Sequence, residues 1–382
     1  MIPTGHRTDL DLVQLLTPTG ERLEHPEYSP RVAHLDPDAL RGFYRDMVLV
    51  RRFDNEATSL QRQGELGLWA QCLGQEAAQV GSGRALAPHD YAFPSYREHG
   101  VAHTRGVDPV DILRLFRGVD HGGGWDPVAH GFHPYTLVIA AHTLHATGYA
   151  MGLQRDGLVG TGDPARDSAV ITYFGDGATS QGDLNESLVF AAVNNAPVVL
   201  FCQNNQWAIS EPTSRQSRVP LAQRGEGFGI PSVRVDGNDV LASYAVTAQA
   251  LERARSGGGP TFIEAFTYRM GAHTTSDDPT RYRSAAEDEY WRQRDPIERL
   301  RVYLSAEGEL PETFVAALEA EAAAAGDRIR TAVRGLGRPE TSRMFDHVYS
   351  APHSIVDSER AWFAAYEASF LNGATADGRS QR

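Results

Sequence analysis

The chain has 382 residues, of which 41% are hydrophobic, and its formal net charge is -13 at pH 7. This length and apolar content are enough to bury the core of one large domain or two modest ones. The negative charge, with no basic run in the sequence, argues against nucleic acid as the main partner.

The cysteine content and the N-terminus indicate the compartment. Cys72 and Cys202 are too few for a disulfide framework and fit a reducing environment. The first residues include acids and no long apolar stretch, which matches neither a secretory signal nor a transit peptide. No run reaches the roughly 18 apolar residues of a membrane span. We expect a cytoplasmic protein that does not bind membranes, unless a transit peptide was removed before residue 1.

The first part of the chain contains an extension, a helix and a loop. Residues 1–34 are rich in proline and polar groups, and we expect this extension to wrap a surface. A helix is predicted from Pro37 to near Gln63, because Asp36 can cap it and apolar residues recur at helical spacing. Residues 118–134 hold several histidines, glycines and two prolines, which predicts a long loop.

Strands and helices alternate in the middle of the chain. β-Branched and aromatic runs predict strands, and helical patterns separate them. The alternation implies right-handed crossovers and a mostly parallel sheet with helices on both faces, which is an α/β fold. The predicted strands are residues 168–174, 197–203, 232–235 and 260–267, and the predicted helices are residues 183–193 and 239–256.

The domain organisation follows from this pattern. Residues 35–300 are expected to form the α/β domain. Residues 301–372 are charged and helical in pattern, and an Ala- and Glu-rich segment within residues 312–333 is expected to be a packing or subunit-contact helix. Residues 373–382 are expected to be a flexible tail.

Gly175-Asp176-Gly177 follows the first predicted strand directly. Ligands of open α/β sheets bind beyond the carboxyl ends of the strands. Glycines there let the backbone approach a phosphate, and the free N–H groups of the helix that follows attract an anion. The carboxylate of Asp176 beside a diphosphate is favourable only with a cation between them.

Asn204-Asn205-Gln206-Trp207 follows the next strand. The 26 residues between Gly177 and Asn204 are enough for one helix and the adjacent strand, so Asp176 and Asn205 should lie at neighbouring strand ends. Mg²⁺ prefers six oxygens. Asp176, the Asn205 amide oxygen and a carbonyl near Trp207 are the predicted protein ligands. A dinucleotide fingerprint fails here, because Ser180 stands where its third glycine is required.

With these motifs the sequence resembles the alpha subunits of 2-oxo acid dehydrogenases that use thiamine diphosphate, above all the branched-chain and pyruvate enzymes. The likeness covers roughly residues 40–350. It runs through the segments RRFDNEATSLQRQGELG, GQEAAQVG, SYREHG, YFGDGATSQGDLNESLVFAA, QNNQWAIS, VDGNDV and YRMGAHTTSDDPTRYR.

The resemblance implies a set of cofactor-binding residues. Tyr96 and Arg97 would grip the diphosphate, since arginine offers a planar fork to phosphate oxygens. His273 lies on the loop that closes over the cofactor and would contact the diphosphate and assist catalysis. Ile139 matches the apolar residue that props the bent cofactor, and Gln203 can touch phosphate. The backbone of the first motif completes the set with Gly175, Asp176, Gly177 and Ala178.

Further expectations concern the loop and its surroundings. Arg269 is expected to stabilise the loop. Thr274 stands where animal relatives carry a regulatory phosphoserine, although we do not favour regulation here. Trp69 lies in a segment that helps to form the substrate pocket of relatives. Residues 135–142 lack the pattern that holds potassium in animal relatives, so no potassium site is expected.

The resemblance also implies partners, because the sequence shows only the diphosphate-binding half of such a site. A beta subunit would bind the aminopyrimidine in an α2β2 assembly at whose interface the cofactor lies. Decarboxylation of a small 2-oxo acid would be followed by acyl transfer to a lipoyl group on an acyltransferase core. The segments VDGNDV and TSDD favour a branched-chain substrate. The alternatives are a pyruvate or acetoin enzyme, or a non-catalytic subunit, which intact Asp176, Asn205 and His273 argue against.

Overall fold

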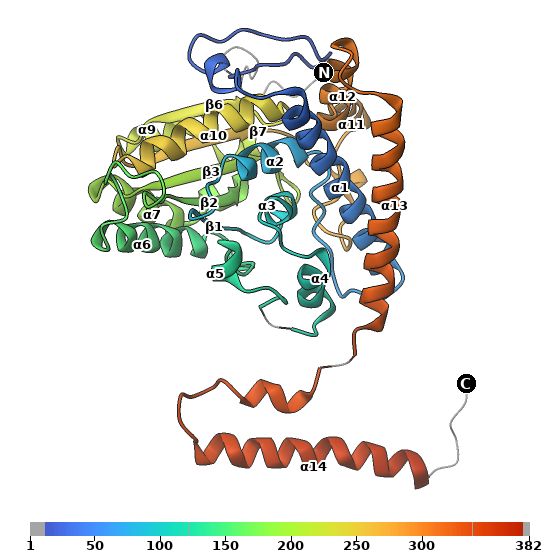
Figure 1. The fold of residues 1–382 in the computed structure, drawn as a ribbon. Coiled ribbons are helices and arrows are strands. Elements are labelled where there is room, and N and C mark those ends of the chain that lie inside the picture. The colour runs from blue at the N-terminus through green and yellow to red at the C-terminus, as the bar shows by residue number, and fades with distance from the viewer. Residues whose placement is uncertain (1–11, 121, 338, 377–382) are drawn as a thin grey trace.

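A parallel sheet organises the computed structural model, which describes residues 12–120, 122–337 and 339–376 (Figure 1). The order of its five strands is β1-β2-β3-β7-β6. The predicted α/β class and all four predicted strands are confirmed. The strands are β1 (Tyr91–Phe93), β2 (Val170–Gly175), β3 (Val198–Asn204), β6 (Ser232–Asp236) and β7 (Thr261–Phe266), and a separate antiparallel pair is formed by β4 (Trp207–Ala208) and β5 (Glu211–Pro212).

Helices cover both faces of the sheet (Figure 1). Helices α6 (Ala141–Arg155) and α7 (Gly182–Val193) lie on one face, and α2 (Glu76–Arg84) and α10 (Val240–Arg255) lie on the other. Successive strand side chains point to opposite faces, so Val198 and Leu200 enter one core while Val199 and Phe201 enter the other. Each central strand is therefore apolar throughout.

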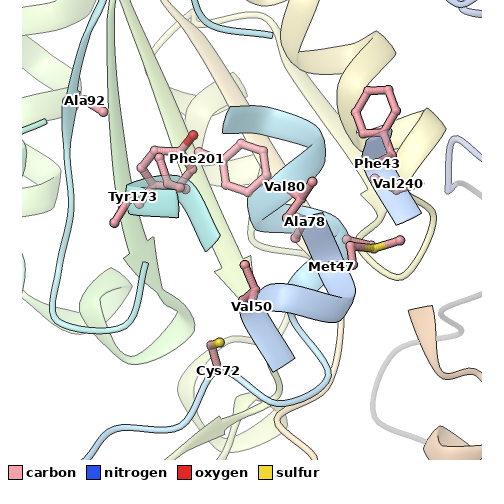
Figure 2. Close-up of a cluster of buried hydrophobic side chains, with 14 of the residues drawn as sticks. Phe43, Met47, Val50, Cys72, Ala78, Val80, Ala92, Tyr173, Phe201 and Val240 are labelled. Atoms are coloured by element: carbon pink, nitrogen blue, oxygen red, sulfur yellow. The ribbon is translucent and has the colours of Figure 1, made fainter. Parts of the chain in front are cut away.

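Helix α1 (Pro37–Arg62) confirms the predicted first helix. The Asp36 side chain accepts a hydrogen bond from the Ala39 N–H at 2.8 Å and so caps the helix. Figure 2 shows the apolar face of α1 against α2 and the sheet. Burial of each large apolar side chain there contributes about 1.5–3 kcal/mol. The cluster includes Phe43, Met47, Val50, Ala78, Val80, Tyr173 and Phe201.

The N-terminal extension joins the sheet instead of only wrapping a surface. Val13 pairs with Val235 at the β6 edge. Leu15 and Leu16 are buried, and their N–H groups donate to the Asp239 carboxylate at 2.6 Å. The same carboxylate caps α10, so one buried acid joins the extension to the core. Residues 1–11 lie outside the described residues.

The C-terminal third is helical, as predicted. Helix α13 (Glu312–Gly335) packs along α1. Helix α14 (Ser354–Ala376) is set apart from the body in Figure 1 and exposes Trp362, Tyr366 and Phe370. Because α14 runs to Ala376, it continues past the expected start of the tail at residue 373; residues 377–382 are not described. The remaining helices are α3 (His99–Thr104), α4 (Pro109–Arg117), α5 (Pro127–His130), which lies within the predicted loop, α8 (Thr213–Gln216), α9 (Ala222–Gly227), α11 (Ala285–Arg292) and α12 (Pro296–Ala306), with short 3-10 turns η1 (Ser29–Arg31), η2 (Asp176–Ser180), η3 (Pro279–Arg281) and η4 (Thr341–Phe345).

In the part of the chain that the structure describes, no helix combines the length and apolarity required to cross a membrane.

Candidate active site

The two motifs meet at the carboxyl edge of the sheet. Strands β2 and β3 are parallel neighbours, and Gly175 is the register partner of Gln203. Asp176 and the Asn204-Asn205 pair therefore leave adjacent strand ends, as predicted. Helix α7 begins at Gly182 and so confirms the predicted helix over residues 183–193, and Asp176 opens a short 3-10 turn, η2, that precedes it. The backbone after Gly177 is a tight turn before it becomes a helix.

A cavity of about 240 Å³ lies at this edge. All the residues predicted to bind the cofactor contribute to its wall. They come from the segment before α3, the loop before α6, the ends of β2 and β3, and the loop after β7, and they are Tyr96, Arg97, Ile139, Gly175, Asp176, Gly177, Ala178, Gln203, Asn205, Trp207 and His273.

Asp176 is held by neutral donors. Its side chain is 1% exposed. The Oδ2 atom accepts hydrogen bonds from Gln216 Nε2 at 2.9 Å and Thr213 Oγ1 at 3.2 Å, both on α8. Burial raises the pKa of Asp176, against the lowering effect of these donors and of Arg269. A cation bound at the cavity would stabilise a carboxylate in this position.

The Asn205 amide has a defined orientation. Its Oδ1 accepts from the Trp207 N–H at 3.4 Å, and its Nδ2 donates to Gln75 Oε1 at 3.1 Å. The Trp207 carbonyl, predicted as a metal ligand, accepts from Arg269 Nη1 at 2.7 Å. One lone pair of that carbonyl is therefore already used, and a second remains.

Two guanidinium groups surround His273. Arg97 Nη2 donates to the His273 carbonyl at 2.8 Å, and Arg97 Nη2 and Arg269 Nη1 each lie 3.3 Å from its Nδ1. Since guanidinium can only donate, Nδ1 is the acceptor and the proton lies on Nε2. Burial, with the positive charges of Arg97 and Arg269, lowers the pKa of His273 to about 3. His273 is thus a neutral imidazole with an N–H to donate.

The loop that carries His273 is held by hydrogen bonds within the loop and to the backbone of Trp69. The Asp277 carboxylate accepts from the His273 N–H at 2.9 Å and from the Tyr282 hydroxyl. Thr275 pairs with the backbone of Trp69, with the Thr275 N–H 3.0 Å from the Trp69 carbonyl. Trp69 itself is fully buried and does not line the cavity. Trp69 supports the loop through these backbone contacts, and a contribution of its segment to the substrate pocket stays a prediction.

The remaining predicted residues occupy distinct places. The Tyr96 ring lies edge-on to His273, with 6.2 Å between ring centroids. Ile139 is 39% exposed and brings an apolar side chain to the cavity. The Gln203 amide already accepts from Gln79 and donates to Glu98, which leaves one N–H for a ligand.

The space around Gly175 and Gly177 indicates why glycine occupies these two positions. A Cβ on Gly177 would lie 2.8 Å from the Ala208 Cβ, so only glycine fits beneath the β4 segment. Gly175 lines the cavity, and a Cβ there would meet no atom within 4 Å. Gly175 therefore keeps the backbone accessible to a ligand.

Three residues of the site were not identified from the sequence. Gln75, Thr213 and Gln216 all contact the predicted metal ligands. Gln75 stands in the quoted segment GQEAAQVG, which is the one signal that pointed to it. Thr213 and Gln216 lie in a short turn of ordinary polar composition, and no sequence pattern places that turn against β2.

Comparison with known proteins agrees with this geometry. The family model described as "Dehydrogenase E1 component" matches residues 44–333. The 3-methyl-2-oxobutanoate dehydrogenase subunit alpha of Mycobacterium tuberculosis (strain ATCC 25618 / H37Rv) is 45% identical over 354 residues, covering 91% of this chain and 88% of the relative. The 2-oxoisovalerate dehydrogenase subunit alpha 2, mitochondrial, of Arabidopsis thaliana is 39% identical, covering 81% and 66%.

A third relative carries a different substrate name. The pyruvate dehydrogenase E1 component subunit alpha of Acholeplasma laidlawii is 40% identical over 321 residues, covering 83% of this chain and 90% of the relative. The family match spans most of the α/β domain and both strand-end motifs. The chain therefore belongs to the dehydrogenase E1 component family of 2-oxo acid dehydrogenase enzymes.

Proposed function

We propose that this chain is the alpha subunit of the decarboxylase component of a branched-chain 2-oxo acid dehydrogenase. The family implies thiamine diphosphate as the cofactor. Two of the relatives, at 45% and 39% identity, are named for branched 2-oxo acids. When bound, thiamine diphosphate supplies the electron sink that lets a 2-oxo acid lose CO₂.

The donor set at the strand ends fits Mg²⁺. Asp176 and Asn205 present hard oxygen ligands at 1% and 5% exposure, and the second lone pair of the Trp207 carbonyl can complete the protein's share. A divalent ion also offsets the burial of the Asp176 carboxylate. We assign these three residues to the metal and leave its remaining positions to phosphate oxygens and water.

The opposite wall supplies cations and donors for the diphosphate. Arg97 and Tyr96 bind it in our proposal, with Gln203 and the backbone of residues 175–178. His273 offers a neutral Nε2–H, which can donate to phosphate or assist proton movement at the cavity mouth. Ile139 supports the cofactor by apolar contact.

The chain needs a partner to complete the reaction. An alpha subunit implies a beta subunit and a complex. We propose an α2β2 assembly in which residues 35–300 bind the diphosphate and residues 301–372 contact other subunits. The exposed aromatic side chains of α14 support this, since such side chains are costly in water. The acyl acceptor would be a lipoyl group on an acyltransferase core.

One observation carries the proposal: Asp176 and Asn205 leave adjacent parallel strands into a cavity that also contains Arg97 and His273. The test is decarboxylation by the chain reconstituted with its partner subunit, with 3-methyl-2-oxobutanoate and pyruvate as competing substrates. We expect the branched substrate to be preferred and Asp176→Ala to abolish Mg²⁺-dependent cofactor binding while the fold survives.

The alternatives give different results. A preference for pyruvate would support a pyruvate dehydrogenase subunit, in line with the 40% identical relative. Cofactor binding without decarboxylation of any 2-oxo acid would support a non-catalytic subunit. Unchanged cofactor affinity in Asp176→Ala would exclude the proposed metal site.

A further inference from the structure

Gln75 is a fully buried amide at the wall of the cavity. It precedes α2 and is 0% exposed. Its Oε1 accepts from Asn205 Nδ2 at 3.1 Å. Its Nε2 has no hydrogen-bond partner among the residues that the structure describes. The oxygen of this amide therefore binds a predicted metal ligand, and its nitrogen makes no hydrogen bond to the described residues.

The hydrogen-bond network fixes which end is which. The Trp207 N–H can only donate, so Asn205 turns its Oδ1 toward it. The Asn205 Nδ2 then faces Gln75, which must answer with its Oε1. The Gln75 NH₂ group is consequently the one without a partner. Rotating either amide by 180° would place two hydrogen-bond donors against each other.

A buried donor without an acceptor destabilises a protein. The neighbouring Glu76 does not accept it: the Glu76 carboxylate accepts from the Gly74 N–H and the Arg51 guanidinium, and no hydrogen bond joins it to Gln75 Nε2. Gln75 lines the cavity, as do Asp176, Arg97 and His273. An anionic oxygen in the cavity is the acceptor that this arrangement lacks.

We propose that Gln75 is a positioning and cofactor-binding residue of this site. Its Oε1 orients the Asn205 amide so that the second lone pair of Oδ1, beside the one that accepts from the Trp207 N–H, can bind the divalent ion. Its Nε2 donates to an oxygen of the diphosphate. This inference rests on the proposed function, since it takes thiamine diphosphate with a divalent ion as the ligand. One neutral side chain then contacts the diphosphate directly and acts on the divalent ion through Asn205.

The experiment uses the full chain with its partner subunit and two substitutions. Gln75→Met removes both hydrogen bonds at similar volume. Gln75→Glu keeps the acceptor for Asn205 but replaces the donor with an oxygen that repels phosphate. Gln293→Met makes the same chemical change at an exposed position, the C-cap of α11, and is the matched control. Thiamine diphosphate affinity at saturating Mg²⁺ is measured by isothermal titration, and melting temperature is measured without cofactor.

We expect both Gln75 variants to bind thiamine diphosphate about ten- to a hundredfold more weakly than the wild type. The melting temperature of Gln75→Met without cofactor should stay close to that of the wild type, because the lost hydrogen bond to Asn205 is offset by removal of a buried donor without an acceptor. The increase on adding cofactor should be smaller in both variants than in the wild type. The Gln293 control should match the wild type in both measurements. If Gln75→Met does not fold, the isosteric Gln75→Glu gives the same comparison.

Wild-type affinity in the Gln75 variants would overturn the inference and leave the proposed function standing. A lowered melting temperature with unchanged affinity would make Gln75 a structural residue only, which also overturns it. Absence of binding by the wild type itself would remove the proposed function and this inference together.

Discussion

Replacing Asp54 by asparagine is expected to flatten the pH dependence of stability at neutral pH. Asp54 lies on α1 and is 1% exposed. Its Oδ1 accepts from Trp69 Nε1 at 2.7 Å, and its Oδ2 has no partner among the described residues. Burial, reinforced by the charge of Glu76 and opposed by the Trp69 hydrogen bond and by the charge of Arg97, raises the pKa of Asp54 to about 7.

The sign and size of the effect follow from this shift. The folded chain holds a proton on Asp54 at pH values where the unfolded chain, with a pKa of 3.8, has lost it. Stability is therefore highest below the unfolded pKa and falls as pH rises through the folded one. At about 1.4 kcal/mol per pKa unit, the loss between about pH 5 and pH 8 is about 2–3 kcal/mol.

The Asp54→Asn variant should lack this loss. Asparagine keeps the acceptor for Trp69, and its unpartnered amide nitrogen costs about 1–3 kcal/mol at every pH. Urea unfolding followed by tryptophan fluorescence, across the same pH range, gives both curves. Asp156→Asn changes an exposed aspartate at the end of α6 and should run parallel to the wild type. Parallel curves for Asp54→Asn as well would refute the reasoning, because Asp54 would then titrate as an ordinary carboxylate.

Three further changes test the site. Gly177→Ala sets a methyl group 2.8 Å from the Ala208 Cβ. We expect a lower melting temperature and a loss of about 1–3 kcal/mol in the free energy of unfolding. An unchanged melting temperature would mean that the β4 segment can move aside without cost. Thr213→Val removes a donor to Asp176; Mn²⁺ affinity, measured by electron paramagnetic resonance, should fall about ten- to a hundredfold, and equal affinity would show that the hydroxyl does not orient the ligand. Arg97→Lys keeps the charge but loses the planar fork; thiamine diphosphate affinity by titration calorimetry should fall about tenfold or more, unless charge alone binds the diphosphate.

Much of the fold is determined locally and is therefore readable from the sequence. The apolar runs that became β2, β3 and β7 are buried on both faces, and such continuous runs are typical of central parallel strands. Asp36 and Asp239 cap their helices with their own side chains, so the helix starts were predictable. The Gly-Asp-Gly and Asn-Asn motifs pointed to adjoining strand ends because one helix fits between them.

Other elements are too short for any pattern. Strand β1 has three residues, and the turn η2 has five, so neither shows a period. They form because the neighbouring β2 offers its backbone groups and because the chain must turn at Gly177. Periodicity over a few residues cannot distinguish such segments from a loop.

The tertiary structure alone decided the details of the site. Gln75 and Gln216 contact the metal-ligand candidates from 130 and 40 residues away in the chain. The lowered pKa of His273 comes from burial and from two arginines that folding brings to the same imidazole nitrogen. The sequence determined which residue types can bind a metal and a phosphate. Orientation and protonation depend on burial and on through-space charge, and those exist only once the distant segments have packed together.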